Sequence, residues 1–386
     1  MERIYLDNSA TTKICKEALD KYIEVSGEHF GNPSSLHALG LDAEKIIEAA
    51  RDEIRTSLGA RGTSVIFTAS GSEANNLAII GRAYAKERFA RGKIITTAGE
   101  HASVDEPLKK LEAEGYRIAR IPTVGGKLDL EVLKNELTPD TVLVTMMMVN
   151  NETGALYDIS AAAKLTKSLA KNALVHVDAT QSYMKIPFTK ASLGADMITL
   201  SSHKIEGPKG VGALVVDANV IKSGGISPLI LGGGQEGGLR SGTENVPAIA
   251  AFSEAARIGR AKLTERYAVL KGLKSYLLDK LSAMPEISIT LPESAAPNIV
   301  NITLPNIKSE TMLHHLSSYG IFVSSGSACS SNSKHSSSAL VAYGRSPEEA
   351  DSSIRISLSH RNTEAELDAF IEALGLGLAR LSRIRR

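Results

Sequence analysis

The sequence predicts an α/β protein with a large domain built on a mostly parallel, seven-stranded sheet, followed by a smaller α+β domain. Three observations support this prediction. Short apolar runs typical of strands alternate with amphipathic stretches typical of helices from residue 65 to residue 216, which indicates a parallel sheet covered by helices. The pattern changes after the glycine-rich stretch 232–242. A chain of 386 residues is also long enough for about two domains.

The elements of the first part follow from their apolar spacing. Residues 14–25 look helical, and residues 40–58 carry apolar residues at helical spacing and stop at Gly59, where a helix can end. The predicted strands are 65–67, 94–95, 117–121, 143–149, 174–177, 198–200 and 213–216. The predicted helices between them are 72–90, 103–114, 129–136 and 160–171. Three successive methionines, 146–148, are expected to fill the core.

The second part begins with a long helix, predicted to follow Pro247 and to run to about Leu281. Short strands are predicted at 287–291, 299–304, 321–324 and 354–357, with a helix at 309–319. Thr363 and Glu366 have the spacing of a capping box, which predicts the start of the last helix.

Composition and charge argue against several classes of partner. Lysine and arginine total 44 against 43 acidic residues, so the net charge of +1 creates no strong field toward nucleic acid or an acidic membrane. The start MERIYLDNSATT lacks the layout of a signal peptide. No apolar run approaches the ~18 to 20 residues of a spanning helix. We therefore expect a cytoplasmic protein that binds neither nucleic acid directly nor a membrane.

The two cysteines, Cys15 and Cys329, are predicted to be free thiols. Neither lies in a CxxC pair, so no metal site is predicted, and a chain of this length needs no disulfide. Cys15 is expected to be a small buried hydrophobe. Cys329 lies in the serine-rich run 324–338, whose lack of apolar periodicity predicts a mobile loop. Lys334 or His335 would lower the pKa of its thiol if they approached it.

Lys204 ends the motif MITLSSHK, directly after a strand-like run, and a turn-rich loop follows it at 205–210. A lysine at the carboxyl end of a buried strand lies where open α/β sheets bind ligands. Its amine can form a Schiff base with an aldehyde cofactor. A solvated lysine in a surface loop is the alternative that the motif alone leaves open.

Polar residues follow four other predicted strands. Ser72 begins a helix among small residues, which suits an anion, although an ordinary capped turn has the same pattern. His101 and Asn151 follow the next strands, and a structural histidine is the ordinary alternative. Asp178 ends an apolar run, where a carboxylate needs a cationic partner, either a protonated pyridine nitrogen or a nearby lysine or arginine. With Gln181, these residues share the sheet edge that binds ligands.

The segments around these residues resemble the pyridoxal-phosphate enzymes of the class V aminotransferase group. The resemblance rests on FTASGSEANN, GEHASV, VNNETG, HVDATQ and LSSHKIEGPKG. The further segments YLDNSATT, FGNPSSLH, RSGTEN and SSGSACSS are similar to those of cysteine desulfurases, the last in the form of the group I branch. The resemblance implies fold type I, with a large cofactor-binding domain at 15–256 and a small domain formed by 1–14 and 257–386.

The resemblance also implies a role for each matched residue. Lys204 would bind pyridoxal 5'-phosphate covalently, His101 would stack on its ring and exchange protons, and Asp178 would pair with the ring nitrogen. The other implied cofactor contacts are Asn151 and Gln181 at the phenolic oxygen, and Gly71, Ser72, Ser201, His203 and, from a second subunit, Thr243 at the phosphate. The implied substrate contacts are Arg355 at the carboxylate, Asn151, and Asn32 near the site mouth. Thr243 in this role implies a homodimer.

Cys329 then defines the implied reaction. Lys204 would remove the Cα proton of L-cysteine, and the Cys329 thiolate would attack the substrate sulfur. L-Alanine would leave, and the persulfide on Cys329 would pass to an acceptor protein, either an iron–sulfur scaffold or an enzyme of tRNA or cofactor thiolation. The alternatives are another enzyme of the same fold, such as a selenocysteine lyase or a small-amino-acid aminotransferase, and a non-enzymatic platform for cluster assembly.

Overall fold

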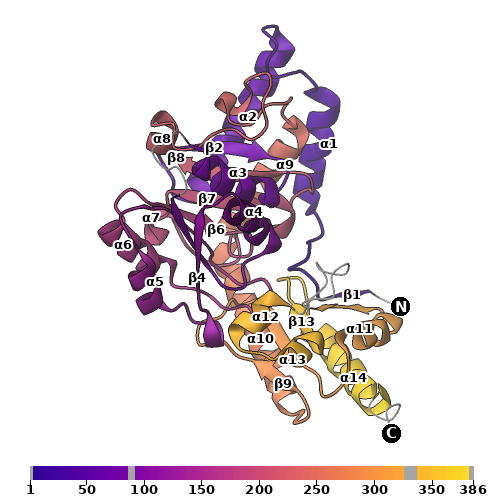
Figure 1. Cartoon of the computed structure of the whole chain (residues 1–386). Coiled ribbons are helices and arrows are strands. Elements are labelled where there is room, and N and C mark those ends of the chain that lie inside the picture. The colour runs from indigo at the N-terminus through magenta and orange to yellow at the C-terminus, as the bar shows by residue number, and fades with distance from the viewer. Residues whose placement is uncertain (1–2, 86–91, 326–336, 382–386) are drawn as a thin grey trace.

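In the computed structural model, which describes residues 3–85, 92–325 and 337–381, the chain forms two main sheets of different size (Figure 1). The larger sheet has seven strands in the order β2–β8–β7–β6–β5–β3–β4. The strands are β2 (Thr63–Thr68), β3 (Lys93–Thr97), β4 (Arg117–Ile121), β5 (Thr141–Met147), β6 (Leu174–Asp178), β7 (Met197–Ser201) and β8 (Gly212–Asp217). β8 runs antiparallel to β2 and β7, and the other neighbours are parallel. The mostly parallel seven-stranded sheet predicted from the sequence is confirmed.

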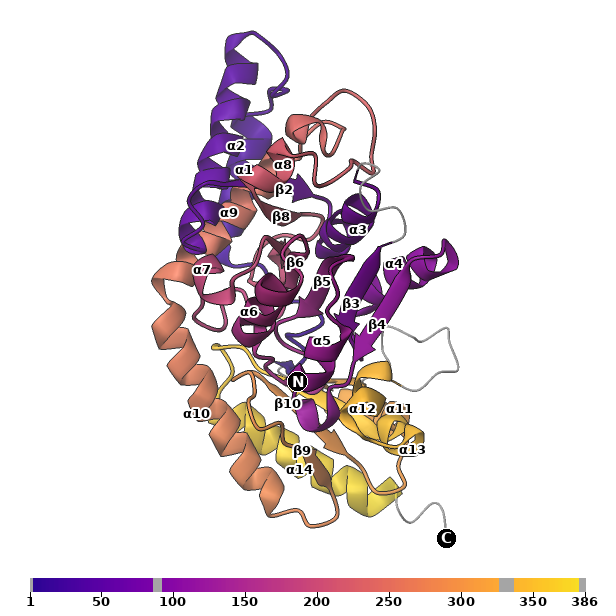
Figure 2. The same cartoon turned by 60° about the vertical axis from the view of Figure 1, so that its left-hand side comes forward.

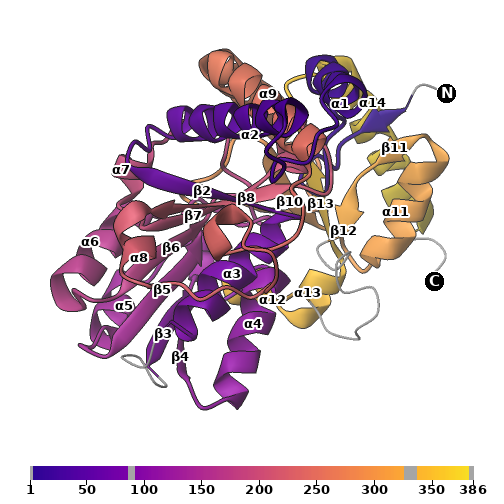
Figure 3. The same cartoon turned by 90° about the horizontal axis from the view of Figure 1, so that it is seen from above.

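Helices cover both faces of this sheet, as Figure 3 shows for α1, α2 and α9 on one side and α3 and α4 on the other. The alternation of side chains along each strand separates the two cores, since Val65 and Phe67 of β2 belong to the first and Ile66 to the second. The first core is covered by α1 (Lys16–Glu28), α2 (Ala38–Ser57), α5 (Leu130–Glu136), α6 (Ile159–Leu169), α7 (Lys190–Leu193) and α9 (Val246–Ala261). The second is covered by α3 (Gly71–Ala83), α4 (Ala102–Ala113) and α8 (Ala218–Lys222).

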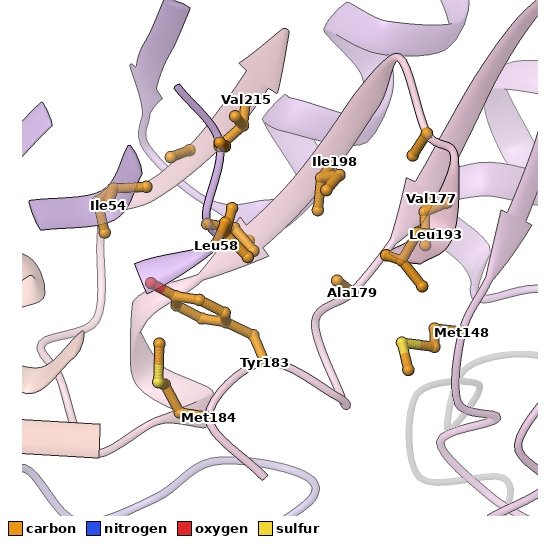
Figure 4. Packing of buried hydrophobic residues seen from close by; sticks show 14 of the residues in the cluster. Ile54, Leu58, Met148, Val177, Ala179, Tyr183, Met184, Leu193, Ile198 and Val215 are labelled. Carbon is orange, nitrogen blue, oxygen red and sulfur yellow. The ribbon is translucent and has the colours of Figure 1, made fainter. Parts of the chain in front are cut away.

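The first core extends into the loop that follows β6. Figure 4 shows Tyr183 and Met184 of that loop beside Leu58, among other buried side chains of this core. The methionines at 146–148 are buried in it, as expected. Cys15 is buried there too, and burial raises the pKa of its thiol, so this cysteine is the small hydrophobe that the sequence predicts.

The smaller sheet is antiparallel, in the order β12–β13–β10–β9. Its strands are β9 (Ser288–Thr290), β10 (Ile299–Thr303), β12 (Ser324–Ser325) and β13 (Ser353–Ser357). The helices of this part are α10 (Leu263–Ser282), α11 (Ser309–Ser318), α12 (Ser338–Tyr343), α13 (Pro347–Asp351) and α14 (Glu364–Leu381). The core of this part is separate from the two cores of the larger sheet. Within the described ranges, no helix combines the length and apolar character that crossing a bilayer requires.

Two helix predictions need correction. The single helix expected after Pro247 is two helices, because Lys262 leaves the helical conformation (φ −109°, ψ 10°) between α9 and α10. The apolar spacing continues across the break because α9 buries its face in the first core and α10 in the core of the smaller sheet (Figure 2). The helix expected at 72–90 ends at Ala83, and its last predicted residues partly lie outside the described ranges. The capping box of Thr363 and Glu366 is confirmed by its two reciprocal hydrogen bonds.

The N-terminal segment connects the two sheets. β1 (Ile4–Tyr5) pairs with β11 (Ile321–Phe322), and Asp7 forms a bridge with Ser357 of β13. A few residues later Thr12 binds the backbone of His203, directly after β7, through both its amide and its hydroxyl. Residues 4–12 therefore contact the smaller sheet at one end and the carboxyl end of the larger sheet at the other.

Glu206 forms a second connection between the two parts. It follows β7, and its buried carboxylate pairs with Arg266 of α10 at 3.2 Å and with Arg361, beyond β13, at 2.9 Å. Its backbone has a positive φ of 67° and also binds Thr12 and Cys15. A buried carboxylate between two guanidinium groups resists replacement, because removing it leaves buried positive charge unpaired.

We predict that Glu206→Gln lowers the free energy of unfolding by about 3 kcal/mol, because the buried Arg266 loses its carboxylate partner. Glu293→Gln is the matched control, since Glu293 is exposed and pairs with Lys127 only at 3.8 Å. Urea unfolding of both variants measures the difference. Equal stability of the two variants would show that Glu206 does not hold the two parts together.

Candidate active site

Lys204 lies one short 3₁₀ turn beyond the end of β7, at the point where the N-terminal segment reaches the larger sheet. Its Nζ donates hydrogen bonds to the backbone carbonyls of Ser9 at 2.6 Å and Ala10 at 2.8 Å. The sequence alone left open a solvated loop lysine. The structure instead holds this amine, which is partly buried, against the N-terminal segment.

Asp178 ends β6 as a buried carboxylate with neutral hydrogen-bond donors. Asn75 of α3 donates to its Oδ2 at 2.8 Å, and the amide of Thr180 donates to Oδ1 at 2.9 Å. No lysine or arginine forms an ion pair with Asp178 within the part of the chain that the structure describes. Because a buried carboxylate is costly without a cation, this site suits a ligand that carries a positive charge.

A hydrogen-bond network joins Asp178 to His101. The Asn75 amide that binds Asp178 also donates to the Ser103 hydroxyl at 2.8 Å, and that hydroxyl lies 2.8 Å from Nδ1 of His101. The backbone amide of Ser103 donates to the same Nδ1, so the proton of the neutral ring lies on Nε2. Burial lowers the pKa of His101, and the charges of Lys204 and Arg355 lower it further, against the attraction of Asp178. His101 is therefore a neutral imidazole near Asp178, Lys204 and Arg355.

The N-terminus of α3 forms a small cradle with two hydroxyl side chains. A Cβ added to Gly71 would lie 3.1 Å from Cβ of Ser201 and 3.3 Å from Oγ1 of Thr180, so only glycine leaves this space open. Neither hydroxyl makes a side-chain hydrogen bond to another described residue. The first amides of a helix and free hydroxyl groups together suit an anionic group such as a phosphate. Ser72 is exposed beside Gly71.

His203 and Gln181 complete the surroundings of Lys204. Nδ1 of His203 lies 3.1 Å from the Thr11 hydroxyl, and burial together with nearby lysines lowers the pKa of this histidine to about 4. Gln181 donates from Nε2 to the Ser9 carbonyl at 3.0 Å, the same carbonyl that Lys204 binds. Both side chains therefore contact the N-terminal segment, Gln181 as a buried residue and His203 as a half-buried one.

Arg355, in β13, reaches across from the smaller sheet. It donates to the backbone carbonyl of Asn151 and to the carboxylate of Asp7, both at 2.9 Å. Its buried Nε has no hydrogen-bond partner among the described residues, and such an orphaned donor suits a ligand carboxylate. The turn after β5, with Asn151, is thereby fixed beside this arginine.

In the described ranges of the chain, neither Thr243 nor Asn32 forms a hydrogen bond with the residues around Lys204. Thr243 is exposed and lines a cavity together with Arg240 and with Thr68 and Ala69, which precede the turn at Gly71. Asn32 is exposed in the loop between α1 and α2, and the contacts of this residue are with Ser34 and Ser35 of the same loop. Figure 1 shows that loop at the far end of the molecule from β13. Cys329 and most of the predicted loop at 324–338 lie outside the described residues.

Sequence reasoning missed several side chains that contact this group. Asn75 and Thr180 lie inside the quoted motifs FTASGSEANN and HVDATQ, so their position in those motifs was the available signal. Asp7 lies inside the quoted motif YLDNSATT and had the same signal. Lys185 lies outside the quoted motifs, and only the folded loop brings its amine to Gln181. Glu152 is also close to the site: burial raises the pKa of this carboxyl to about 7, and it accepts a hydrogen bond from Ser337.

Together these groups fit pyridoxal 5'-phosphate. A lysine amine matches its aldehyde, the helix cradle matches its phosphate, and the cation-free Asp178 matches its protonated ring nitrogen. Across residues 3–85, 92–325 and 337–381, no cluster of histidine, cysteine and acidic side chains has the form of a metal site.

The fold and this set of residues define a pyridoxal-phosphate enzyme of fold type I. The chain matches the family model described as Aminotransferase class-V over residues 4–370, and it belongs to this family, whose cofactor is pyridoxal 5'-phosphate. Within the family it is a member of the cysteine desulfurases, as the following relatives show.

The curated cysteine desulfurase IscS 1 of Archaeoglobus fulgidus is 38% identical to this chain over 373 residues, which cover 96% of this chain and 95% of the relative. A solved structure of a NifS-like protein is similar with a TM-score of 0.91 and 36% identity, covering 98% of this chain and 100% of that one. The structure of SspA in complex with cysteine is similar with a TM-score of 0.80 and 31% identity, covering 93% of this chain and 100% of that one.

We predict that Gly71→Ala weakens binding of pyridoxal 5'-phosphate by the apoprotein about tenfold or more, which is about 1.4 kcal/mol, because the new methyl group enters the cradle. Gly272→Ala is the control, since a Cβ there meets nothing within 4 Å. Absorbance titration of both apoproteins gives the dissociation constants. Equal affinity in the two variants would place the phosphate elsewhere.

Proposed function

We propose that this protein is a cysteine desulfurase that converts L-cysteine to L-alanine and leaves the substrate sulfur on Cys329. One observation carries the proposal. The chain matches curated cysteine desulfurases over nearly its whole length. At one edge of its larger sheet it also holds the amine of Lys204, the buried carboxylate of Asp178 without a cationic partner among the described residues, and the open anion cradle at Gly71. The motif SSGSACSS, which contains Cys329, supports the sulfur chemistry.

Lys204 and Asp178 would both contribute to removing the proton from the α-carbon of the substrate. Pyridoxal 5'-phosphate, when bound, supplies an electron sink for the pair of electrons released at the α-carbon. Lys204 would hold the cofactor covalently and, once displaced by the substrate amine, would take the Cα proton at its Nζ. Asp178 would keep the ring nitrogen protonated, while Asn75 and Thr180 orient the carboxylate of Asp178.

The remaining residues would orient cofactor and substrate. Gly71, Ser72, Ser201 and His203 would hold the phosphate, with Thr180 as a further hydroxyl. Asn151 and Gln181 would lie by the phenolic oxygen, and His101, neutral with its proton on Nε2, would stack on the ring and exchange protons. Arg355 would bind the substrate carboxylate, and its unpartnered Nε supports this role.

Cys329 would carry the sulfur. Its thiolate would attack the substrate sulfur, forming a sulfur–sulfur bond while the carbon–sulfur bond breaks, and the electron pair of the broken bond would stay with the carbon. Protonation of that carbon would complete L-alanine, and the persulfide would remain on Cys329. A sulfur-acceptor protein would then take the terminal sulfur. The relative named IscS 1 supports iron–sulfur assembly as one route for that sulfur.

We also infer a homodimer in the cytoplasm. Within one chain neither Thr243 nor Asn32 forms a hydrogen bond with the described residues around Lys204, so we infer that both act at the site of a second copy. Large apolar side chains are exposed in the same two loops, with Phe30 70%, Leu36 94% and Leu231 79% exposed, and such groups favour an interface. The two domains would comprise residues 15–256 and residues 1–14 with 257–386.

We predict that Cys329→Ser lowers the rate of alanine formation from L-cysteine at least about a hundredfold, because the nucleophile is lost. Cys15→Ala, which removes the buried thiol, should retain the activity. Mass spectrometry of the wild-type protein after one turnover should find one added sulfur atom on the peptide containing Cys329. Full alanine and sulfide production by Cys329→Ser would refute the persulfide step and leave a lyase of another kind.

We predict that Lys204→Ala abolishes the visible absorbance that wild-type protein gains on addition of pyridoxal 5'-phosphate. Lys209→Ala removes an exposed lysine from the same loop and should not change this absorbance. A wild-type protein that stays colourless would indicate a non-enzymatic platform. A visible band retained by Lys204→Ala would assign the covalent bond to another lysine.

A further inference from the structure

Lys185 is a buried lysine that the proposed mechanism does not use. It lies in the loop after β6, where the apolar neighbours Tyr183, Met184 and Ile186 are buried in the core of the larger sheet. Successive backbone hydrogen bonds from Ser182, Tyr183, Lys185 and Ile186 fold the loop into tight turns. The residue is 9% exposed, so its amine cannot extend into solvent as an ordinary lysine does.

The amine of Lys185 binds one member of the site and lies near another. Its Nζ donates to Oε1 of Gln181 at 3.1 Å, while Nε2 of the same amide donates to the Ser9 carbonyl that accepts from Lys204. The oxygen of the Gln181 amide is therefore held by Lys185, and its nitrogen binds the same Ser9 carbonyl as Lys204. Lys185 and Lys204 also line one small cavity between the larger sheet and α10.

No acidic side chain pairs with Lys185 in the part of the chain that the structure describes. Glu206, Arg266 and His360 line the same cavity, but Glu206 is engaged by Arg266 and Arg361. The other charged groups that act on Lys185 are Lys204 and Arg355, and both repel it. His203 is a further titratable neighbour that feels the charge of Lys185. A buried cation without a counterion is costly to keep, which points to a use for its charge.

We propose that Lys185 is a positioning residue for Lys204, which fixes the orientation of the Gln181 amide and sets a second positive charge near the Lys204 amine. This proposal rests on the proposed role of Lys204 in binding the cofactor. The repulsion is mutual, so the charge of Lys185 favours the neutral form of the Lys204 amine, which is the form that attacks an aldehyde and accepts a proton.

The pKa of Lys185 agrees with this arrangement. Burial, with the charges of Lys204 and Arg355, lowers its pKa to about 7. Lys185 therefore still carries part of its positive charge at neutral pH, where that charge acts on the Lys204 amine. Removing Lys185 leaves Lys204 with less repulsion, so the pKa of the Lys204 amine rises.

The test measures how fast the apoprotein captures pyridoxal 5'-phosphate between pH 6 and pH 10, with borohydride trapping and quantification of the modified Lys204 peptide. Lys185→Met removes both the charge and the hydrogen bond, Lys185→Gln keeps a donor without the charge, and Lys185→Arg keeps both. Lys209→Met, at an exposed lysine of the same loop as Lys204, is the control.

We expect the midpoint of the capture profile to rise by about one pH unit in Lys185→Met and Lys185→Gln, with capture at pH 7 about tenfold slower. Lys209→Met should keep the wild-type midpoint, and Lys185→Arg, whose charge persists over the whole pH range, should keep or lower it. The affinity for the cofactor at high pH should fall in Lys185→Met but not in Lys185→Gln, because only the first loses the contact with Gln181. If Lys185→Met does not fold, the glutamine and arginine variants still decide the charge effect.

Three results would overturn the proposal: a wild-type midpoint in Lys185→Gln, a raised midpoint in Lys185→Arg, or a raised midpoint in Lys209→Met. The proposed function fails in a different way. If wild-type protein is not modified at Lys204 at any pH, the assignment of Lys204 is wrong, whatever Lys185 does.

Discussion

The contact between the Lys204 amine and the carbonyls of Ser9 and Ala10 is the constraint on which the site depends. A lysine side chain has four rotatable bonds and loses much entropy when it is fixed. Here two strong acceptors hold it, and they come from a segment that has no regular structure of its own at these residues. That segment keeps its position because β1 pairs with β11 at one end and Thr12 binds the backbone of His203 at the other. The amine is therefore fixed only when both sheets are in place.

The charges around Lys204 favour an anionic ligand at this site. Lys204 and Arg355 both repel Lys185. Among the acids nearby, Asp178 accepts from neutral donors, Asp7 pairs with Arg355, and Glu206 pairs with Arg266 and Arg361. Collecting cations in a partly dehydrated space raises the free energy of the folded protein. A phosphate at the α3 cradle and a substrate carboxylate at Arg355 would each lower it. A ligand that binds the folded state alone also stabilises that state, so cofactor binding should contribute to the stability of the whole larger sheet.

The sequence predicts what is periodic or local and misses what is brought together by the fold. Strand ends follow from apolar runs, so the placement of Asp178 and Lys204 after successive strands could be predicted, and the capping box of Thr363 follows from four adjacent residues. The break at Lys262 could not be predicted. The apolar spacing continues across it, although α9 packs in the first core of the larger sheet and α10 in the core of the smaller sheet. The antiparallel direction of β8 has no signature in its own residues. Lys185 looks like any lysine until its loop is folded, because it becomes buried together with its apolar neighbours Tyr183, Met184 and Ile186.

The same N-terminal segment also contacts both Arg355 and Lys204, the two groups that we propose meet the substrate amino acid. Asp7 pairs with Arg355, and Ser9, two residues later, accepts from Lys204. Asn8, between them, donates through both its amide and its side chain to the carbonyl of Ser357, and the Ser9 amide donates to the hydroxyl of that serine. Three consecutive residues thus lie between the guanidinium that we propose binds the substrate carboxylate and the amine that we propose acts on the α-carbon. Because every α-amino acid has the same short spacing between carboxylate and α-carbon, this segment can fix that spacing without contacting the side chain of the substrate. Selection for L-cysteine must then come from elsewhere, and a nucleophilic thiol that reacts only with a substrate sulfur would provide it.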